Sequence, residues 1–363
     1  MKKLFAMALA AGMSLAMTAC GTGGTQTTAG GTTAAAGGGT TTAAANSGTT
    51  AAEGSSIPYP ERSIKALIGY GAGGSTDNAM RPLLSVAEKI LGQSIVVENV
   101  SGGSASIAFQ SAFEANSDGY TLIVGAETPA LYDAYDLIDY TYSDAAMVMV
   151  AADCAQHIFV SKDSPYDTFE DLVNAEKENP GSVLKVASGN VGINASIESI
   201  WSATIGTNFS VYTADNASSA VTTVMGGFAD FGLGNTATLY DYYKNGDIKI
   251  LCTCRSDRDP ALPDVPAITE TYPEMADYLP MKAFYTVAVK GDTDPEIVAY
   301  LQKVFEEAYQ SEEYQAVLKQ LQLDPVGAVG DAATEYVDTF RKNALTALTK
   351  SGAVKKTMQE LGY

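Results

Sequence analysis

The chain has 363 residues, 46% of them apolar, which is enough to bury a core and predicts about two domains. Its 42 Asp and Glu residues against 22 Lys and Arg residues give a formal net charge of −20 at pH 7. This charge disfavours nucleic acids and anionic lipid surfaces as binding partners, so we expect no nucleic-acid partner.

Residues 1–20 have the pattern of a secretory signal, with two lysines, an apolar run from Leu4 to Met17, and small residues before Cys20. The apolar run is too short to cross a bilayer durably. The four residues from Met17 to Cys20 resemble the lipobox of bacterial lipoproteins, which predicts lipidation of Cys20. The alternative is an ordinary signal that is cleaved after Ala19.

Residues 21–56 consist almost wholly of Gly, Thr, Ala and Ser. Such a segment has little apolar surface to bury and a high chain entropy, so it is predicted to be a flexible tether. The signal and the tether together predict an extracytoplasmic lipoprotein anchored to a membrane, either at the cell surface or in a periplasm.

Beyond the tether, short β-branched runs alternate with amphipathic stretches of helical length, a pattern typical of parallel sheets flanked by helices. The first series has strands at 64–70, 94–99 and 121–126 and helices at 76–91 and 104–115. The second series has helices at 168–179, from 194, from 216 and at 236–245, and strands at 184–188, 209–213, 229–234 and 248–254. The chain therefore contains two α/β units.

The last part of the chain is predicted to be helical at 294–310 and 332–350, after an apolar strand at 283–290. We expect it to pack back onto the first unit. Lobe 1 then comprises residues 57–157 and 282–363, and lobe 2 comprises residues 158–281. Each lobe is predicted to hold a mixed or mostly parallel sheet with flanking helices, and the ligand cleft is predicted to lie between the lobes.

Each series opens with a strand that leads into a loop of small residues and then a helix. In the first loop, Gly69, Gly71 and Gly74 match the G-x-G-x-x-G fingerprint of dinucleotide sites, and Glu98 ends the next strand where a ribose-binding acid would stand. A simpler anion site fits equally well, because glycines let the backbone approach a ligand and a helix N-terminus attracts any anion. A nicotinamide cofactor is not expected as a stable partner of a protein exported from the cytoplasm. We therefore expect an anion site and no cofactor.

Side chains in this first loop add candidate contacts. Ser75 and Thr76 can donate hydrogen bonds from their hydroxyls, and Tyr70 lies between the glycines. Asp77 can cap the first turn of the helix and fix the shape of the loop, which favours a structural role over ligand contact.

Two further segments offer polar groups. Glu127 and Thr128 follow the third strand of the first series, at the edge of the sheet where the first loop also lies. Glu127 could contact an amino group on the ligand or face solvent. In the second loop, Ser188, Asn190 and Asn194 supply neutral hydrogen-bonding groups, although Asn194 could equally be only the N-cap of its helix.

The usual catalytic and metal-binding patterns are missing. The one histidine, His157, excludes a multi-histidine metal cluster and is predicted to be a strand residue. The sequence has no Walker A motif, no H-E-x-x-H and no G-x-S-x-G. Cys154, Cys252 and Cys254 are predicted to be free and buried. We therefore expect neither a metal site nor an enzyme.

Several segments occur together in one known family. They are YPERSIKALIGYGAGGSTD, LGQSIVVEN, DGYTLIVG, TFEDLVNAEKENPGSVLKVAS, VMGGFADFGL and RSDRDPALPDVPAITE. Over nearly all of residues 59–363, the chain resembles the tripartite tricarboxylate transporter receptors.

The resemblance implies a two-lobed fold like that of periplasmic binding proteins, which closes on its ligand by a hinge. It implies a monomeric receptor that delivers a small organic acid or amino acid to a large and a small membrane transporter subunit. It also implies that Gly73, Gly74, Ser75 and Thr76 hold carboxylate oxygens. A receptor that feeds a signalling protein would share these features, and adjacent transporter genes would separate the two possibilities.

The second loop departs from the family pattern. The family commonly has Ser-Pro-Gly-x-Gly-Ser where residues 188–193 are Ser-Gly-Asn-Val-Gly-Ile, and a histidine near the position of Ser196. Tyr212 stands where the family often has a tyrosine, and Asp230 matches the acid of its Gly-Gly-x-x-Asp segment. By resemblance, both are candidate cleft residues.

Overall fold

The computed structural model describes residues 58–179, 184–189, 191–207, 209–279 and 281–363. The predicted signal, Cys20, the tether and Asn190 lie outside these residues. Within the described part, no helix combines the length and the apolar character that crossing a membrane requires.

The first series of strands forms a parallel array in the order β2-β1-β3. Its strands are β1 (Ile64–Ile68), β2 (Ile95–Asn99) and β3 (Thr121–Gly125), and its helices are α1 (Ser75–Leu91) and α2 (Ser106–Glu114). The apolar residues of α1 recur at helical spacing and are buried against the sheet, which is why this stretch forms an amphipathic helix. Three short 3-10 helices lie in this part of the chain: η1 (Gly103–Ala105) before α2, and η2 (Thr128–Leu131) and η3 (Tyr142–Asp144) after β3.

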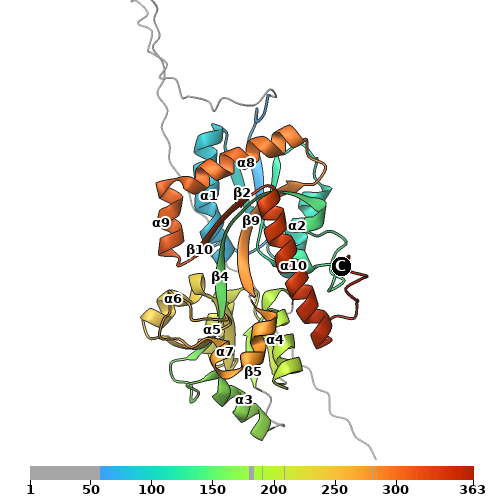
Figure 1. The fold of residues 1–363 in the computed structure, drawn as a ribbon. Coiled ribbons are helices and arrows are strands. Elements are labelled where there is room, and N and C mark those ends of the chain that lie inside the picture. The colour runs from blue at the N-terminus through green and yellow to red at the C-terminus, as the bar shows by residue number, and fades with distance from the viewer. Residues whose placement is uncertain (1–57, 180–183, 190, 208, 280) are drawn as a thin grey trace, which may run out of the picture. The chain divides into compact units, whose positions relative to one another are not determined.

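Two long antiparallel strands connect the two series. β4 (Ala145–Ser161) pairs with β9 (Lys282–Lys290) from Ala145 opposite Lys290 to Ala155 opposite Lys282. Nearly all of β4 is buried, because sheet neighbours and helices cover both of its faces. Figure 1 shows β4 and β9 running side by side from the elements around α1 and α8 to those around α4 and α5. The predicted lobe boundaries fall within β4 and at the start of β9, and they stay a prediction.

The second series is built on the far half of β4. β7 (Phe231–Asn235) and β8 (Ile248–Thr253) pair antiparallel with β4, and the parallel array β7-β5-β6 extends from there through β5 (Lys185–Ser188) and β6 (Ser210–Thr213). The helices are α3 (Phe169–Glu178), α4 (Ile193–Thr204), α5 (Ala217–Met225), α6 (Thr236–Lys244), α7 (Ile268–Thr271) and the 3-10 helix η4 (Pro273–Tyr278).

Most of the C-terminal part packs onto the first series, and its last helix also lies against α4 of the second series. It consists of α8 (Pro295–Gln310), α9 (Glu312–Gln320), β10 (Asp324–Val329) and α10 (Asp331–Ser351). α8 and α9 lie against α1, and Lys89 of α1 pairs with Glu313 of α9 at 2.7 Å. The sequence prediction missed α9 and β10. α9 follows α8 after Ser311 without a glycine or proline, so the sequence shows no boundary between the two helices. β10 contains Pro325 and Gly327, two residues that are uncommon inside strands, so its sequence does not indicate a strand.

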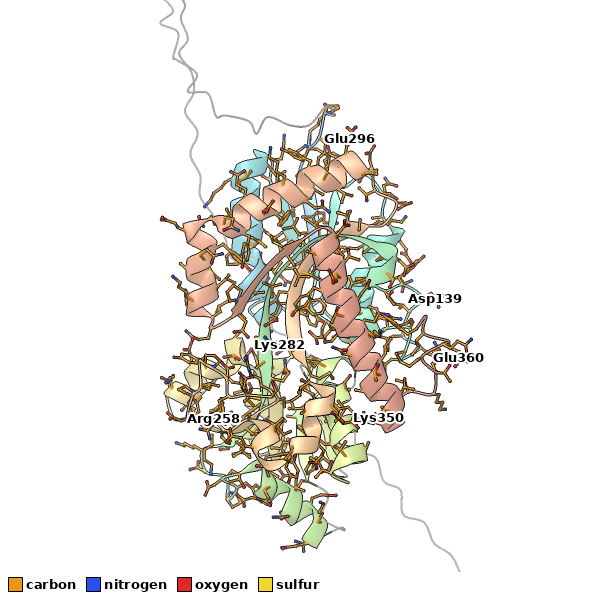
Figure 2. The ribbon with its side chains drawn as sticks, in the orientation of Figure 1. Asp139, Arg258, Lys282, Glu296, Lys350 and Glu360 are labelled. Carbon is orange, nitrogen blue, oxygen red and sulfur yellow. The ribbon has the colours of Figure 1, made fainter. Side chains whose placement is uncertain are left out.

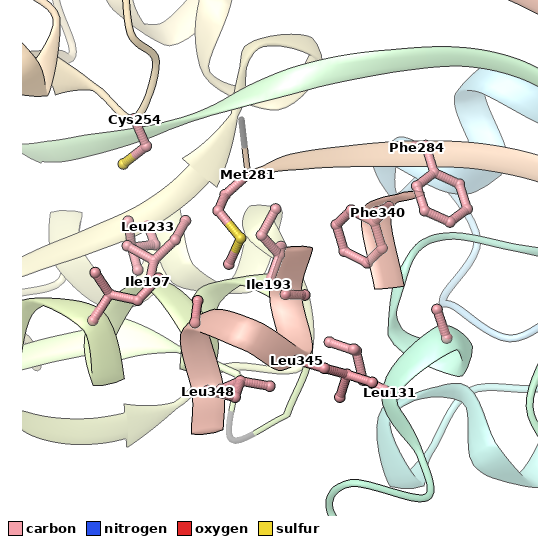
Figure 3. Packing of buried hydrophobic residues seen from close by; sticks show 14 of the residues in the cluster. Leu131, Ile193, Ile197, Leu233, Cys254, Met281, Phe284, Phe340, Leu345 and Leu348 are labelled. Atoms are coloured by element: carbon pink, nitrogen blue, oxygen red, sulfur yellow. The ribbon is translucent and has the colours of Figure 1, made fainter. Parts of the chain in front are cut away.

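One cluster of buried hydrophobic residues extends through both series of elements. In Figure 3, Leu345 of α10 lies beside Leu131 of η2, and Leu348 lies farther along the same helix. Trp201 of α4 is also fully buried in this cluster. Cys154, Cys252 and Cys254 are free and buried, as predicted.

α10 also holds the end of η2 through a buried cation. Arg341 is 5% exposed and donates two hydrogen bonds to the carboxylate of Asp133, at 2.8 and 2.6 Å. It donates further to the carbonyl oxygens of Ala130 and Leu361. Because η2 directly follows Glu127, Arg341 fixes the segment that carries this candidate site residue.

We predict that Arg341→Met destabilises the protein by about 2–3 kcal/mol, because it leaves Asp133 and buried carbonyl oxygens without their donor. Chemical denaturation measures the change. The control is Lys342→Met, which makes the same kind of substitution at the exposed next position of α10. Equal stabilities of the two variants would contradict the role given to Arg341.

Candidate ligand-binding site

A cavity of about 490 Å³ opens where the parallel strands of both series end. Loops after β1, β2, β3, β5 and β6 contribute to its lining, as does the end of β7. Ligands of α/β proteins bind beyond the carboxyl ends of parallel strands, because the loops and helix N-termini gather there. The described lining residues are Gly69, Tyr70, Gly71, Gly74, Ser75, Thr76, Ser101, Gly102, Gly103, Ser104, Ala105, Ala126, Glu127, Thr128, Gln156, Ser188, Gly189, Val191, Ile193, Asn194, Thr213, Ala214, Asp215, Asn216, Ala217, Ala220, Leu233, Asn235, Ala283 and Tyr285.

The first loop brings the N-terminus of α1 to this cavity. α1 begins at Ser75 after the extended residue Gly74, so the backbone N–H groups of its first turn have no carbonyl partners within the helix. The cavity lining includes four residues of this loop that the sequence suggested as ligand contacts: Tyr70, Gly74, Ser75 and Thr76. The Ser75 hydroxyl accepts a hydrogen bond from Asn235 Nδ2 at 3.1 Å, which links the first loop to the second series.

Gly73 and Asp77 lie outside the lining and hold the loop in shape. Asp77 is buried and accepts hydrogen bonds from the Gly73 backbone N–H, Arg81 and Asn99, at distances between 2.6 and 3.3 Å. Burial alone would raise the pKa of Asp77, but these donors lower it below its ordinary value. The structural role that the sequence favoured for Asp77 agrees with these contacts.

Glu127 is the buried carboxyl group of the cavity. It is 6% exposed and follows β3, and its pKa is raised to about 7 by burial. Hydrogen bonds from its own backbone N–H, the backbone N–H of Ile193 and the Thr128 hydroxyl offset only part of this effect. Glu127 therefore does not simply face solvent.

The ionisable groups that surround Glu127 are neutral near pH 7. They are Tyr70, Tyr132, Tyr142, Cys154 and Tyr285, and burial raises the pKa of each above its ordinary value. The Tyr70 hydroxyl, buried near Glu127 and Thr128, has no partner of normal hydrogen-bonding geometry in the described structure. Glu127 is thus the group of this set that changes charge between pH 5 and pH 8.

The second loop approaches the segment of Glu127. Gly192 has φ of +93°, and a Cβ there would lie 2.6 Å from Thr128 Oγ1, so only glycine permits this contact. The N-cap of α4 is Gly192, so Asn194 is not the N-cap. Instead, Asn194 and Ser188 line the cavity, and Asn194 Oδ1 is buried without a hydrogen-bond partner. Asn190 is outside the described residues.

The two residues taken from the family pattern lie away from the cavity lining. Asp230 accepts a hydrogen bond from the Lys185 backbone N–H at 2.7 Å, at the opposite end of β5 from Ser188. Tyr212 is 41% exposed and packs against Phe228. Asp230 lies just before β7 and Tyr212 lies within β6, so neither residue is in the loops that line the cavity. The two residues suggested by the family resemblance are therefore not part of the described lining.

Sequence reasoning missed several lining groups. Residues 101–105 form a loop after β2 with left-handed backbone at Ser104 and Ala105, and its Ser-Gly-Gly-Ser run after a strand was a usable signal. Asn216 and Asn235 are N-caps of α5 and α6, and each could have been found as a polar residue after a strand. Gln156 and Tyr285 lie within β4 and β9, where no local signal marks them.

The described lining supplies little support for a metal or a dinucleotide. No group of three or more His, Cys, Asp or Glu side chains in the described residues is arranged to hold a metal ion. Glu98, the candidate ribose-binding acid, is instead paired with Lys65 at the surface, 3.1 Å away, and lies outside the cavity lining.

The raised pKa of Glu127 predicts a pH-dependent stability. The folded protein binds this proton more tightly than the unfolded chain, so the stabilisation is complete below about pH 4.5 and is lost as pH rises to about 7. In ligand-free protein, Glu127→Gln should therefore match the wild type near pH 4 and exceed its stability at pH 8, by up to ~3 kcal/mol. Denaturation across this range measures the difference. Glu98→Gln is the exposed control, and parallel curves for Glu127→Gln and the wild type would refute the prediction.

Comparisons with known proteins place the chain in a family. The model of the "Tripartite tricarboxylate transporter family receptor" matches residues 79–347. The "UPF0065 protein in gbd 5'region" of Cupriavidus necator is 28% identical over 306 residues, 84% of this chain and 92% of that protein. The solved structure of periplasmic binding protein BugD has a TM-score of 0.74 at 21% identity, covering 82% of this chain and all of that one. MatC from Rhodopseudomonas palustris, solved with bound malate, has a TM-score of 0.72 at 19% identity, covering 81% of this chain and 100% of MatC.

These likenesses confirm the predicted two-lobed α/β fold of the periplasmic-binding-protein type. The chain belongs to the tripartite tricarboxylate transporter receptor family, whose members are solute-binding receptors and not enzymes.

Proposed function

We propose that this protein is an extracytoplasmic lipoprotein that captures a small carboxylated solute and delivers it to a membrane transporter with one large and one small subunit. Membership of the receptor family supports the role of receptor. The signal-like N-terminus and Cys20 in a lipobox-like sequence support export and lipid anchoring. The ligand seen in MatC is a dicarboxylate, which supports the same ligand class here.

The observation that carries this proposal is the convergence of helix N-termini on the cavity. The first residues or N-caps of α1, α4, α5 and α6 line it: Ser75, Ile193, Asn216 and Asn235. Helix N-termini present unpaired N–H groups and partial positive charge, which suit the oxygens of a carboxylate. None of the described lining residues is Lys, Arg or His, so the described lining would attract an anion through these backbone groups together with hydroxyl and amide side chains.

The proposed mechanism is closure of two lobes, residues 57–157 with 282–363 and residues 158–281, about the strands β4 and β9. The ligand first docks on the loop at Gly74 and Ser75. Lobe 2 then closes, and Ser188, Asn190 or Asn194 replace water around the ligand. The contacts of Asn235 with Ser75 and of Gly192 with Thr128 join the two sets of loops and would form on closure. A ligand drives closure only by binding the closed state more tightly.

Thermal melting of the full-length chain against mono-, di- and tricarboxylates, amino acids and NAD tests the proposal, since a ligand of the folded state raises the melting temperature. We expect a shift with a carboxylated solute that is nearly unchanged between low and moderate salt. Gly74→Val should abolish the shift, because its side chain would occupy the cavity beside Gly71.

Ser85→Val, on the exposed face of the same helix α1, is the matched control and should keep the shift. A shift with NAD alone would contradict the proposal. A carboxylate shift that survives Gly74→Val would contradict the placement of the site at the first loop.

A further inference from the structure

The cavity holds a buried carboxyl group without a cationic partner and an amide oxygen without a donor. Glu127 accepts hydrogen bonds from its own backbone N–H, the Ile193 backbone N–H and the Thr128 hydroxyl, but none of these donors is charged. Glu127 lines it as a buried carboxyl group, and Asn194 Oδ1 lines it without a partner. Both belong to the part of the cavity where the loop of Gly192 meets Thr128. A buried acceptor without a donor costs free energy, so a ligand that brings donors to this place is favoured.

The described surroundings of Glu127 do not provide a positive charge. The residues that line the cavity include no Lys, Arg or His, and the other acidic one, Asp215, is exposed. The neighbouring Tyr70, Tyr132, Tyr142, Cys154 and Tyr285 are neutral. A buried carboxylate normally has a cationic or metal partner. The described lining offers Glu127 no cationic side chain, and no group of three or more His, Cys, Asp or Glu among the described residues is arranged as a metal site.

The two halves of the lining therefore differ in polarity. The helix N-termini at Ser75, Asn216 and Asn235 favour negative charge, whereas Glu127 and Asn194 Oδ1 favour a donor with positive charge. A plain carboxylate would satisfy the first group and would be repelled by an ionised Glu127. A zwitterion satisfies both.

We propose that Glu127 is a specificity-determining residue, which binds the protonated amine of an amino acid whose carboxylate is held at the helix N-termini. This inference rests on the proposed function, because it assumes that the cavity binds a carboxylated solute. It assigns the ligand to the amino acids in preference to the corresponding amine-free acids.

Matched ligand pairs test this assignment with the full-length chain. Each pair has one carbon skeleton with and without the amine: aspartate and succinate, glutamate and glutarate, and 2-aminoadipate and adipate. Titration calorimetry at pH 8 should show binding of at least one amino acid about 10- to 100-fold tighter than of its amine-free partner, the range expected for a hydrogen bond to a charged group. Glu127→Gln should remove that preference, so that the two members of each pair bind with nearly equal affinity.

Glu98→Gln, the exposed glutamate of β2, is the matched control and should keep the preference. Melting of each variant without ligand verifies that it is folded. If the amine-free acids bind the wild type as tightly as the amino acids, or if Glu127→Gln keeps the preference, the inference is wrong and carboxylate capture still stands. If neither class binds, the proposed function fails, and the inference fails with it.

The pH dependence, compared between the wild type and Glu127→Gln, gives a second result. The comparison separates Glu127 from Glu198 of α4, a largely buried carboxyl group that contacts Ser188 and whose pKa is also raised to about 7 by burial. Binding of an amine requires ionised Glu127, so amino acid affinity should fall as pH drops from 8 to 5, approaching tenfold per pH unit below about pH 7. If Glu127 instead donates a proton to a plain carboxylate, affinity should rise over the same range. An affinity that rises on acidification would overturn the inference.

Discussion

The continuous antiparallel pairing of β4 with β9 is the constraint on which the rest of the structure depends. Both series of βα units are attached to this pair, so their parallel strands end at one common place. Lys282, labelled in Figure 2, lies at the start of β9. It bridges Asp153 of β4 and Asp324 of β10, each at 2.9 Å, and Asp153 also accepts a hydrogen bond from Tyr336 of α10. This partly buried network ties four elements together where the two series meet.

In the proposed function, the cavity attracts an anion through helix N-termini rather than through basic side chains, because no Lys, Arg or His is among the described lining residues. Small residues after each strand let helix N-termini approach a ligand, and the chain's net charge of −20 makes a local source of positive potential necessary. The same arrangement leaves side chains free to decide which carboxylate is accepted. Glu127 is the buried charged side chain in the described lining, so selectivity by charge falls mainly to it.

The position of Glu127 also depends on α10, a helix near the C-terminus. η2 follows it directly, and Arg341 of α10 holds η2 through Asp133 and the Ala130 carbonyl. α10 also packs against α4, whose N-terminus donates to Glu127 (Figure 3). One helix near the C-terminus thus contacts the elements on both sides of the candidate amine site. Any hinge motion must preserve or exchange this contact, because its apolar side chains are buried.

The sequence by itself determined the alternation of strands and helices, the strand-loop-helix units and the polar residues at Ser75, Glu127, Ser188 and Asn194, because hydrophobic period and small-residue loops are local signals. Only the tertiary structure decided that Gln156, Asn235 and Tyr285 join the cavity and that Asp230 does not. It also decided the antiparallel pairing of β4 with β9 and β10, and gave the N-cap of α4 to Gly192. These features depend on which distant segments lie side by side, and pairing between strands more than a hundred residues apart leaves no periodic pattern in either strand.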